Sequence, residues 1–142
     1  MILQMEKKID IHKAGGILIQ ERRFLVNRSR GKDIFMSPGG KLESGETPEE
    51  ALIRELNEEL SIEVELQDLT QFGTFYAPAA GEEDSLLKMS VFLVNRWGGD
   101  IQPSSEIEEV LWINSLVPDG IKLGSIFEHE VLPRLKQGDL ID

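Results

Sequence analysis

The feature that most constrains the fold is a helix whose start and two contrasting faces are readable from residues 47–60. Thr47 is a good N-cap, Pro48 suits the first helical position, and Glu50 completes a Thr-x-x-Glu capping box. Apolar side chains recur at every fourth position, at Leu52, Leu56 and Leu60. This spacing predicts an amphipathic helix that packs one stripe of side chains against a core.

The same helix carries an acidic stripe. Glu55, Glu58 and Glu59 stand at relative positions i, i+3 and i+4, which places three carboxylates close together on one side. Such charges repel one another unless a cation neutralises them. Because the chain has no cysteine, a carboxylate cluster favours a hard divalent ion, Mg²⁺ or Mn²⁺. The alternative is an acidic face that is simply solvated.

Glycine-rich turns lead into this helix. Residues 35–40 read Phe-Met-Ser-Pro-Gly-Gly, and Gly45 predicts another turn just before the cap. The adjacent Gly39 and Gly40 permit backbone conformations that other residues avoid, and they allow a ligand to approach closely. Exposed backbone groups beside an anionic cluster suit a phosphate that is bridged by metal ions.

These residues together resemble the Nudix box, Gly-x5-Glu-x7-Arg-Glu-U-x-Glu-Glu-x-Gly-U, in which U is a bulky aliphatic residue. The chain matches this pattern at Gly40, Glu46, Arg54, Glu55, Leu56, Glu58, Glu59 and Ile62. It departs at Ser61, where the family has Gly. A left-handed residue is expected at this position, so Ser61 there would cost about 1 kcal/mol relative to Gly.

The resemblance implies a fold and a reaction. The fold is α+β, a Nudix-type α/β/α sandwich with a mixed β-sheet and a loop–helix–loop catalytic motif. The resemblance covers residues 12–113 well and the remaining tail only weakly. The implied reaction is metal-dependent hydrolysis of a nucleoside diphosphate that is linked to another moiety, X.

It also implies which residues bind metal. Glu55, Glu58 and Glu59 are expected as direct ligands of the ion. A backbone carbonyl of Gly39 or Gly40 would complete the shell. Two-metal sites of this kind place their ions about 3.5–4 Å apart.

Other residues are expected to support the chemistry. Glu46 would act from the outer shell through water, and Arg54 would orient carboxylates, with Glu50 and Glu58 both in reach at four-residue spacing. Glu106 begins a Glu-Ile-x-Glu segment that resembles a recurrent family segment. We interpret Glu106 as an extra ligand or the general base, the alternative being a surface carboxylate.

Two substrate classes stay open. The opening over residues 25–40 resembles small MutT-type members, which cleave nucleoside triphosphates, including oxidised ones, to a nucleoside monophosphate and pyrophosphate. Pro78 resembles a proline of ADP-ribose-cleaving members, so ADP-ribose or a nucleotide sugar is the alternative. Four aromatic residues could stack on a base, although core packing is the simpler interpretation, namely Phe35, Phe75, Tyr76 and Trp112.

Two other functions also fit the sequence. A Nudix-fold module could sense a nucleotide without cleaving it, although a sensor has less need of intact Glu55, Glu58 and Glu59. The acidic helix could instead meet a basic partner without any metal. Neither His12 nor His129 lies in the motif, and we interpret them as a strand-edge residue and a helix-surface residue.

Hydrophobic periodicity predicts the remaining elements of a mixed α and β chain. A tight turn at residues 20–22 predicts a hairpin, and residues 78–85 are expected to form a loop. A helix is expected over residues 124–135, with Pro133 as a kink or boundary. Strands are expected over residues 13–20, 23–28, 34–36, 62–66, 69–77, 86–96 and 110–113.

Length and charge bound the remaining possibilities. The 142 residues predict one soluble domain spanning 1–142. A monomer or a homodimer is expected. The net charge of −11 argues against binding duplex nucleic acid, but not against a small nucleotide held through metal ions. Met1–Asp10 does not resemble a signal peptide and no apolar run is long enough to span a membrane, so a cytoplasmic location is expected.

Overall fold

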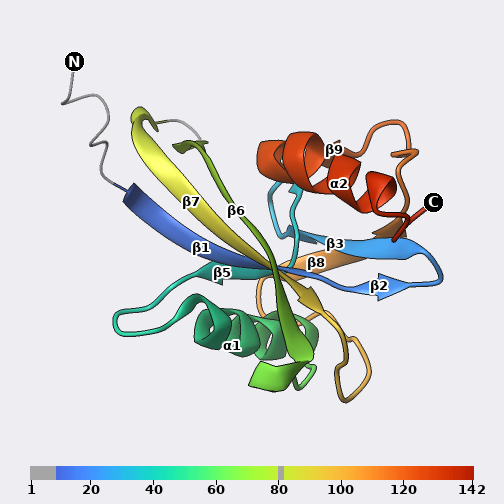
Figure 1. Cartoon of the computed structure of the whole chain (residues 1–142), viewed down its shortest axis with the longest axis horizontal. Coiled ribbons are helices and arrows are strands. Elements are labelled where there is room, and N and C mark those ends of the chain that lie inside the picture. Colours follow the sequence, from blue (N-terminus) through green and yellow to red (C-terminus); the bar gives the residue numbers. More distant parts are fainter. Residues whose placement is uncertain (1–8, 80–81) are drawn as a thin grey trace.

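Strands fill the middle of the molecule, with helix α1 (Pro48–Leu60) on one side and helix α2 (Leu132–Gln137) on the other (Figure 1). The computed structural model describes residues 9–79 and 82–142. Met1–Asp10, the segment that we expect not to be a signal peptide, lies largely outside the described residues. Within the described ranges, no helix combines the length and apolar character needed to cross a membrane.

The strands of the described residues belong to three hydrogen-bonded groups. One sheet has the order β5-β1-β7-β6, a second has the order β2-β3-β8, and β4 pairs with β9. The bounds are β1 Ile9–Ile17, β2 Ile19–Gln20, β3 Arg23–Ser29, β4 Ile34–Phe35, β5 Gly39–Lys41, β6 Leu69–Ala79, β7 Glu82–Val94, β8 Ile107–Ile113 and β9 Lys122–Leu123. Because β1 is parallel to β7 and antiparallel to β5, the first sheet is mixed, and the expected fold class is confirmed.

The start of α1 agrees with its sequence in detail. The Thr47 side chain accepts a hydrogen bond from the Glu50 N–H at 3.1 Å, and the Glu50 carboxylate accepts one from the Thr47 N–H at 2.9 Å. The helix ends at Leu60, and Ser61 follows with φ 63° and ψ 24°, the expected left-handed conformation. The predicted capping box and helix end are therefore confirmed.

The strand expected over residues 13–20 belongs to both larger sheets. It begins earlier, at Ile9, and breaks at Leu18, so that β1 pairs with β7 whereas β2 pairs with β3. The Leu18 carbonyl accepts a hydrogen bond from the Leu25 N–H at 3.1 Å, which bridges the break. The predicted hairpin is confirmed, with Glu21 and Arg22 both at positive φ, as a tight two-residue turn requires.

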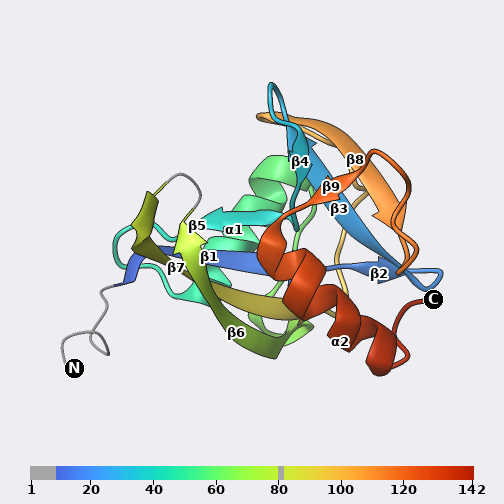
Figure 2. The ribbon, with the colours of Figure 1, turned by 90° about the horizontal axis from the view of Figure 1, so that it is seen from above.

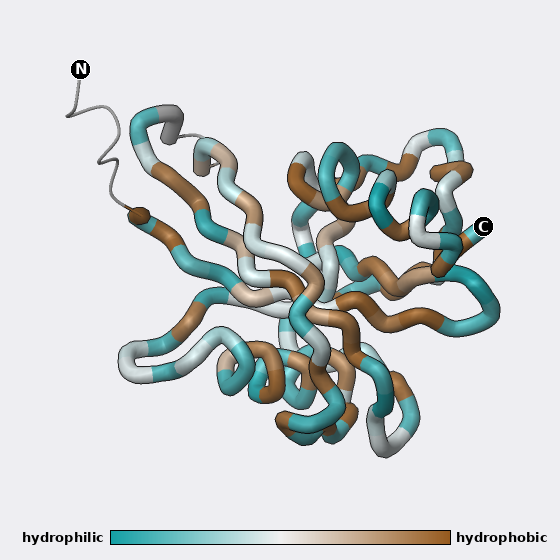
Figure 3. Tube along the Cα trace, in the orientation of Figure 1, coloured by the Kyte–Doolittle hydropathy of each residue, from teal (hydrophilic) through white to brown (hydrophobic). Residues whose placement is uncertain are grey.

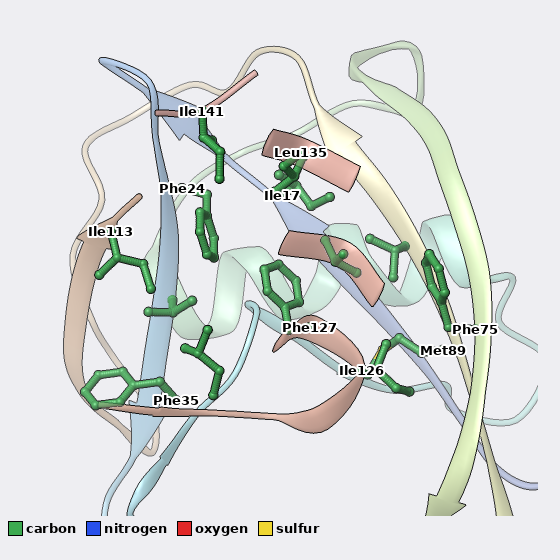
Figure 4. Close-up of a cluster of buried hydrophobic side chains, with 14 residues drawn as sticks. Ile17, Phe24, Phe35, Phe75, Met89, Ile113, Ile126, Phe127, Leu135 and Ile141 are labelled. Carbon is green, nitrogen blue, oxygen red and sulfur yellow. The ribbon is translucent and has the colours of Figure 1, made fainter. Parts of the chain in front are cut away.

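Two apolar clusters fill the space between the sheets and the helices. One packs the C-terminal helix against β1 and β3, and Figure 4 shows Phe24, Ile17 and Leu135 meeting there. The other packs the buried face of α1, including Leu52 and Leu56, against the opposite side of β1 and β3. Along α1 hydrophobic and hydrophilic residues alternate (Figure 3), as its amphipathic pattern predicts.

Several predicted elements were wrong. Residues 62–66 form no strand, because only a single bridge joins Glu63 to Gly98 before a 3-10 helix at Leu66–Asp68. Ile62 and Val64 still bury their side chains. The alternation of apolar and polar residues therefore indicated which side chains are buried and not that the segment pairs with another strand. The loop expected over residues 78–85 is shorter, since β6 runs to Ala79 and β7 starts at Glu82, with residues 80–81 outside the described part.

Two short strands escaped prediction. β5 contains two glycines, which pattern reasoning assigns to turns, and β9 has only two residues. The C-terminal helix runs over residues 125–137 and includes a π-helical turn, Phe127–Val131, immediately before α2. Pro133 lies inside this helix, and the Leu132 N–H reaches back to the Phe127 carbonyl instead of making an α-helical bond.

Candidate active site

The acidic face of α1 opens onto a cavity of about 440 Å³. The walls come from segments far apart in the sequence, since β1, β3, β5 and α1 all contribute, together with Glu106 before β8. Strands β1 and β5 lie beside α1 (Figure 2), and their register places Ala14 opposite Gly40. Glu55 and Glu59 reach this cavity from the helix, and Gly39 and Gly40 reach it from β5.

Both glycines of β5 are needed for this close packing. Gly39 has φ 143°, and a Cβ atom there would overlap the Ala14 carbonyl oxygen. A Cβ atom at Gly40 would overlap the Glu55 carboxylate. The glycines therefore allow close packing against β1 at Gly39 and against α1 at Gly40, whereas the close approach of a ligand stays a prediction.

Arg54 holds several carboxylates at the edge of the cavity. Its Nε and Nη2 atoms donate to the two carboxylate oxygens of Glu46 at 2.8 and 2.9 Å, a bidentate pair. Its Nη1 donates to Glu55 at 2.9 Å and to Glu58 at 3.3 Å, and Nη2 also donates to the Lys41 carbonyl at 3.1 Å. The expected contact with Glu58 is present, whereas Glu50 is engaged in the helix cap.

The ion pair of Arg54 and Glu46 shifts the pKa values of both residues. The Arg54 guanidinium lowers the pKa of Glu46 to about 2, and the Glu43 N–H adds to the effect. The Glu46 hydrogen bonds in turn raise the pKa of Arg54. Both groups therefore stay charged at neutral pH and form a rigid support beside Glu55.

The pKa values of Glu55 and Glu59 are raised, whereas that of Glu46 is lowered. Burial, followed by the hydrogen bond with Glu58, raises the pKa of Glu55 to about 7. Glu59 is only 6 % exposed, and burial together with the charges of Glu55 and Glu106 raises its pKa to about 8. The Gly39 N–H donates to Glu59 at 2.9 Å, which fixes the carboxylate but opposes only part of this shift.

Glu58 is placed differently from the other two predicted ligands. Its side chain is 50 % exposed, faces Arg54, and does not line the cavity. The structure instead gathers Glu55, Glu59 and Glu106 around the cavity. Among the described residues, no three His, Asp or Glu side chains already stand at metal-binding distances, so the ligand set of Glu55, Glu58 and Glu59 stays a prediction.

Glu106 lies at the cavity, although 47 positions separate it from Glu59 in the sequence. Asn27 also lines the cavity, and we did not predict it. Its Nδ2 is buried and makes no hydrogen bond of good geometry to any described residue, yet the side chain lies near enough to lower the pKa of Glu59. A sequence signal was available, because Asn27 is the first polar residue after the apolar run of β3.

A second cavity of about 490 Å³ adjoins the acidic one. The two share Lys13, Met36, Ser37, Lys41 and Met89 as lining residues, and we call the two adjoining cavities together the hollow. The second part is largely apolar, with Phe127 among its walls. Lys13 and Lys41 pair across β1 and β5 where the two parts meet, and burial, then Lys41, lowers the pKa of Lys13.

None of the four candidate aromatic residues lines either cavity. Phe35 and Phe75 are buried in the core, as their packing interpretation predicts (Figure 4). Tyr76 is exposed, and Trp112 faces a separate surface hollow beside Trp97. Base-stacking roles for these residues therefore have no support in the geometry.

The histidines are also away from both cavities. His12 lies on β1, which is an inner strand, so the strand-edge prediction was wrong. Its Nε2 pairs with the Ser90 hydroxyl at 2.9 Å, and burial, followed by Lys88, lowers the pKa of His12. His129 lies on the helix surface, as expected.

Comparison with known proteins identifies the family of this chain. The NUDIX domain model matches residues 10–132, which include all the elements that line the acidic cavity. The chain belongs to the Nudix family. The membership confirms the resemblance of residues 40–62 to the Nudix box and identifies the chain as a pyrophosphohydrolase. Together with relatives that are named diphosphatases, it favours an enzyme over the nucleotide sensor and the metal-free interaction protein.

Individual proteins of known sequence or structure also resemble this chain. An 8-oxo-dGTP diphosphatase of Haemophilus influenzae is 37% identical over 114 residues, covering 77% of this chain and 79% of the relative. An ADP-ribose pyrophosphatase of Methanocaldococcus jannaschii is 28% identical over 66% of this chain and 56% of the relative. The solution structure of the E. coli ORF135 protein has a TM-score of 0.72 at 22% identity, covers 93% of this chain and 94% of that one, and supports the fold.

Nudix hydrolases generally use divalent metal ions, and the donors of this cavity fit such an ion. Carboxylate oxygens are the ligands that hard divalent ions prefer. Glu55 and Glu59 face the cavity with raised pKa values, which means that their ionised forms are poorly compensated by the chain itself. A bound cation would stabilise those ionised forms.

Proposed function

We propose that this Nudix hydrolase cleaves a nucleoside triphosphate, including oxidised forms, to a nucleoside monophosphate and pyrophosphate. The observation that carries the proposal is the hollow, in which an acidic part adjoins an apolar part. The apolar part suits a nucleoside, whose base offers a large uncharged face. The acidic part suits a phosphate chain that arrives with metal ions.

The metal would be Mg²⁺ or Mn²⁺, held by Glu55, Glu58 and Glu59 with a carbonyl of Gly39 or Gly40. When bound, such an ion polarises phosphate oxygens and lowers the pKa of a water molecule. Rotation of the exposed Glu58 side chain away from Arg54 would add it to Glu55 and Glu59. Arg54 would then keep Glu55 in place through its bidentate support on Glu46.

Glu106 is the candidate general base. Its carboxylate would take the proton of the attacking water while the water oxygen bonds to phosphorus and the pyrophosphate leaves with the electrons of the broken P–O bond. Lys13 and Lys41 stand where the phosphate chain would pass between the two parts of the hollow. Their positive charges would offset the charge of the phosphates farthest from the metal.

Similarity to the 8-oxo-dGTP diphosphatase of Haemophilus influenzae, which spans most of this chain, supports a nucleoside triphosphate as the substrate. ADP-ribose is the second candidate. Pro78, the residue that favours it, lines the apolar part of the hollow, and a similar chain is named an ADP-ribose pyrophosphatase. A nucleotide sugar belongs to the same alternative, because the linkage that is broken is again a diphosphate.

A hydrolysis screen with product identification tests this proposal. The protein is incubated with Mg²⁺ or Mn²⁺ and with nucleoside triphosphates, 8-oxo-dGTP, ADP-ribose and nucleotide sugars. Nucleoside monophosphate and pyrophosphate are the expected products, whereas preferential release of AMP and ribose phosphate would support the alternative. No turnover of any compound would overturn both. Glu59→Gln should abolish turnover, and the exposed Glu63→Gln is its matched control.

We further propose that the enzyme works in the cytoplasm, where nucleoside triphosphates are made and used, as a monomer or homodimer. Light scattering at two protein concentrations would distinguish the monomer from the dimer.

A further inference from the structure

A short segment, residues 102–106, ties the end of α1 to the acidic cavity. The last carbonyls of a helix have no partner inside the helix and need donors from elsewhere. Here the Gln102 N–H donates to the Leu60 carbonyl and the Ser104 N–H donates to the Glu59 carbonyl, each at 2.9 Å. The Ser104 hydroxyl also donates to the Glu58 carbonyl. We call residues 102–106 the capping segment.

Ser61 adds a contact that the family's usual glycine could not make. Its hydroxyl donates to the Gln102 carbonyl at 3.1 Å while its backbone holds the left-handed conformation. A glycine would adopt this conformation at less cost but has no side chain to donate. The departure of Ser61 from the Nudix pattern therefore coincides with a specific bond to the capping segment.

The far end of the capping segment carries Glu106 to the cavity. The Arg30 N–H, one residue past the end of β3, donates to the Glu106 carbonyl at 2.7 Å. The Ser105 hydroxyl lies 3.1 Å from a carboxylate oxygen of Glu106, and Ser105 itself has φ 57°. Only Ser105 separates Ser104 from Glu106, so a shift of the Ser104 anchor would move the Glu106 carboxylate.

We propose that Ser61 and Ser104 are positioning residues, whose hydroxyls hold the capping segment against α1 and thereby fix Glu106 beside Glu59. The inference rests on the proposed function for its kinetic test. Displacements of about 1 Å can cost about a hundredfold in rate. Loss of one hydroxyl leaves the backbone hydrogen bonds intact, so it should displace Glu106 by less than about 1 Å and lower the rate by less than about a hundredfold.

Kinetics of Ser61→Gly and Ser104→Ala test the proposal. We expect kcat to fall about threefold for Ser61→Gly and about tenfold for Ser104→Ala, with KM within about twofold, because substrate contacts are untouched. Thr70→Val is the matched control, since it removes a hydroxyl that binds Asn95 far from the cavity. It should leave kcat unchanged.

A double-mutant cycle links the effect to Glu106. In a Glu106→Gln background, Ser104→Ala should lower kcat by less than about twofold, because the group it positions is already lost. Full additivity, or wild-type kcat in both serine variants, would overturn the proposal. Ser61→Gly relieves left-handed strain, which offsets part of the stability that is lost with the Ser61 hydrogen bond.

Hydrogen exchange provides a readout that needs no turnover. The Arg30 amide donates to the Glu106 carbonyl in the capping segment, and the Ser104 amide donates from that segment to the Glu59 carbonyl of α1. Both amides should exchange faster in Ser104→Ala than in Thr70→Val. If the wild-type protein hydrolyses no nucleotide, the proposed function fails and exchange alone decides whether the segment is held by these hydroxyls. Equal exchange in all variants would overturn the inference.

Discussion

Arg54 grips Glu46 through two parallel hydrogen bonds, from Nε at 2.8 Å and from Nη2 at 2.9 Å. Eight positions separate the two residues, and the pair spans the turn before α1 and the middle of that helix. The same guanidinium reaches Glu55 at 2.9 Å. The turn, the helix and one cavity carboxylate are therefore connected through one planar group, and this connection has two testable consequences.

The first concerns acid stability. Folding lowers the pKa of Glu46 from 4.5 to about 2, so between these pH values the unfolded chain binds more protons. The stabilisation is fully present above pH 4.5 and is lost as the pH falls toward 2. In urea unfolding at pH 7 to 3, the midpoint of Glu46→Gln should fall less steeply than that of the wild type. Parallel curves would contradict the pairing.

The second concerns the shape of the cation. Lysine keeps the charge but cannot make two parallel bonds to one carboxylate. Arg54→Lys should therefore lower kcat by about 10- to 100-fold, because Glu55 loses its support. The matched change Arg96→Lys, at a side chain that is 80% exposed, should leave steady-state kinetics unchanged. Equal kinetics for the two variants would show that charge alone suffices.

Gly40 limits the space beside Glu55. A Cβ atom there would overlap the Glu55 carboxylate, so Gly40→Ala should push that side chain aside and lower kcat by about 100-fold. At Gly98 an added Cβ would meet only the Glu63 carbonyl, at an ordinary 3.8 Å. Gly98→Ala is therefore the control in steady-state assays, and comparable activity of the two variants would argue against this packing.

Lys13 should act on the phosphate chain. Lys13→Met removes a cation shared by both parts of the hollow and should raise KM for a triphosphate about tenfold, with a smaller effect on kcat. Lys88→Met, on the neighbouring strand β7 and away from both cavities, should leave KM unchanged. If added salt raises KM equally in the wild type and Lys13→Met, the charge of Lys13 has no such role.

The C-terminal tail should contribute to stability through one buried side chain. Ile141 is fully buried in the cluster that includes Phe24 and Leu135, so Ile141→Ala should lower the free energy of unfolding by about 2–5 kcal/mol. Its neighbour Leu140 is 37% exposed, and Leu140→Ala should cost less than about 1 kcal/mol. Chemical denaturation compares them, and equal losses would contradict the docking of the tail.

Local patterns were reliable where neighbours in the sequence are neighbours in space. The capping box of Thr47 and Glu50, the left-handed Ser61 and the hairpin at Glu21 all depend on a few adjacent residues. Failures occurred where pairing decides the structure. Residues 62–66 have strand-like alternation but no partner strand, and β5 has unfavourable glycines but a partner in β1.

The sequence by itself determined the helix, its acidic stripe and the family, because a fixed spacing of residues along one helix carries that information. Tertiary structure alone decided that Lys13 faces Lys41, that Glu106 joins Glu59, and that Glu58 turns to Arg54. Those relationships depend on strand register and on loops that bring distant segments together. No local periodicity encodes such contacts, because their energy arises only once the whole chain has packed.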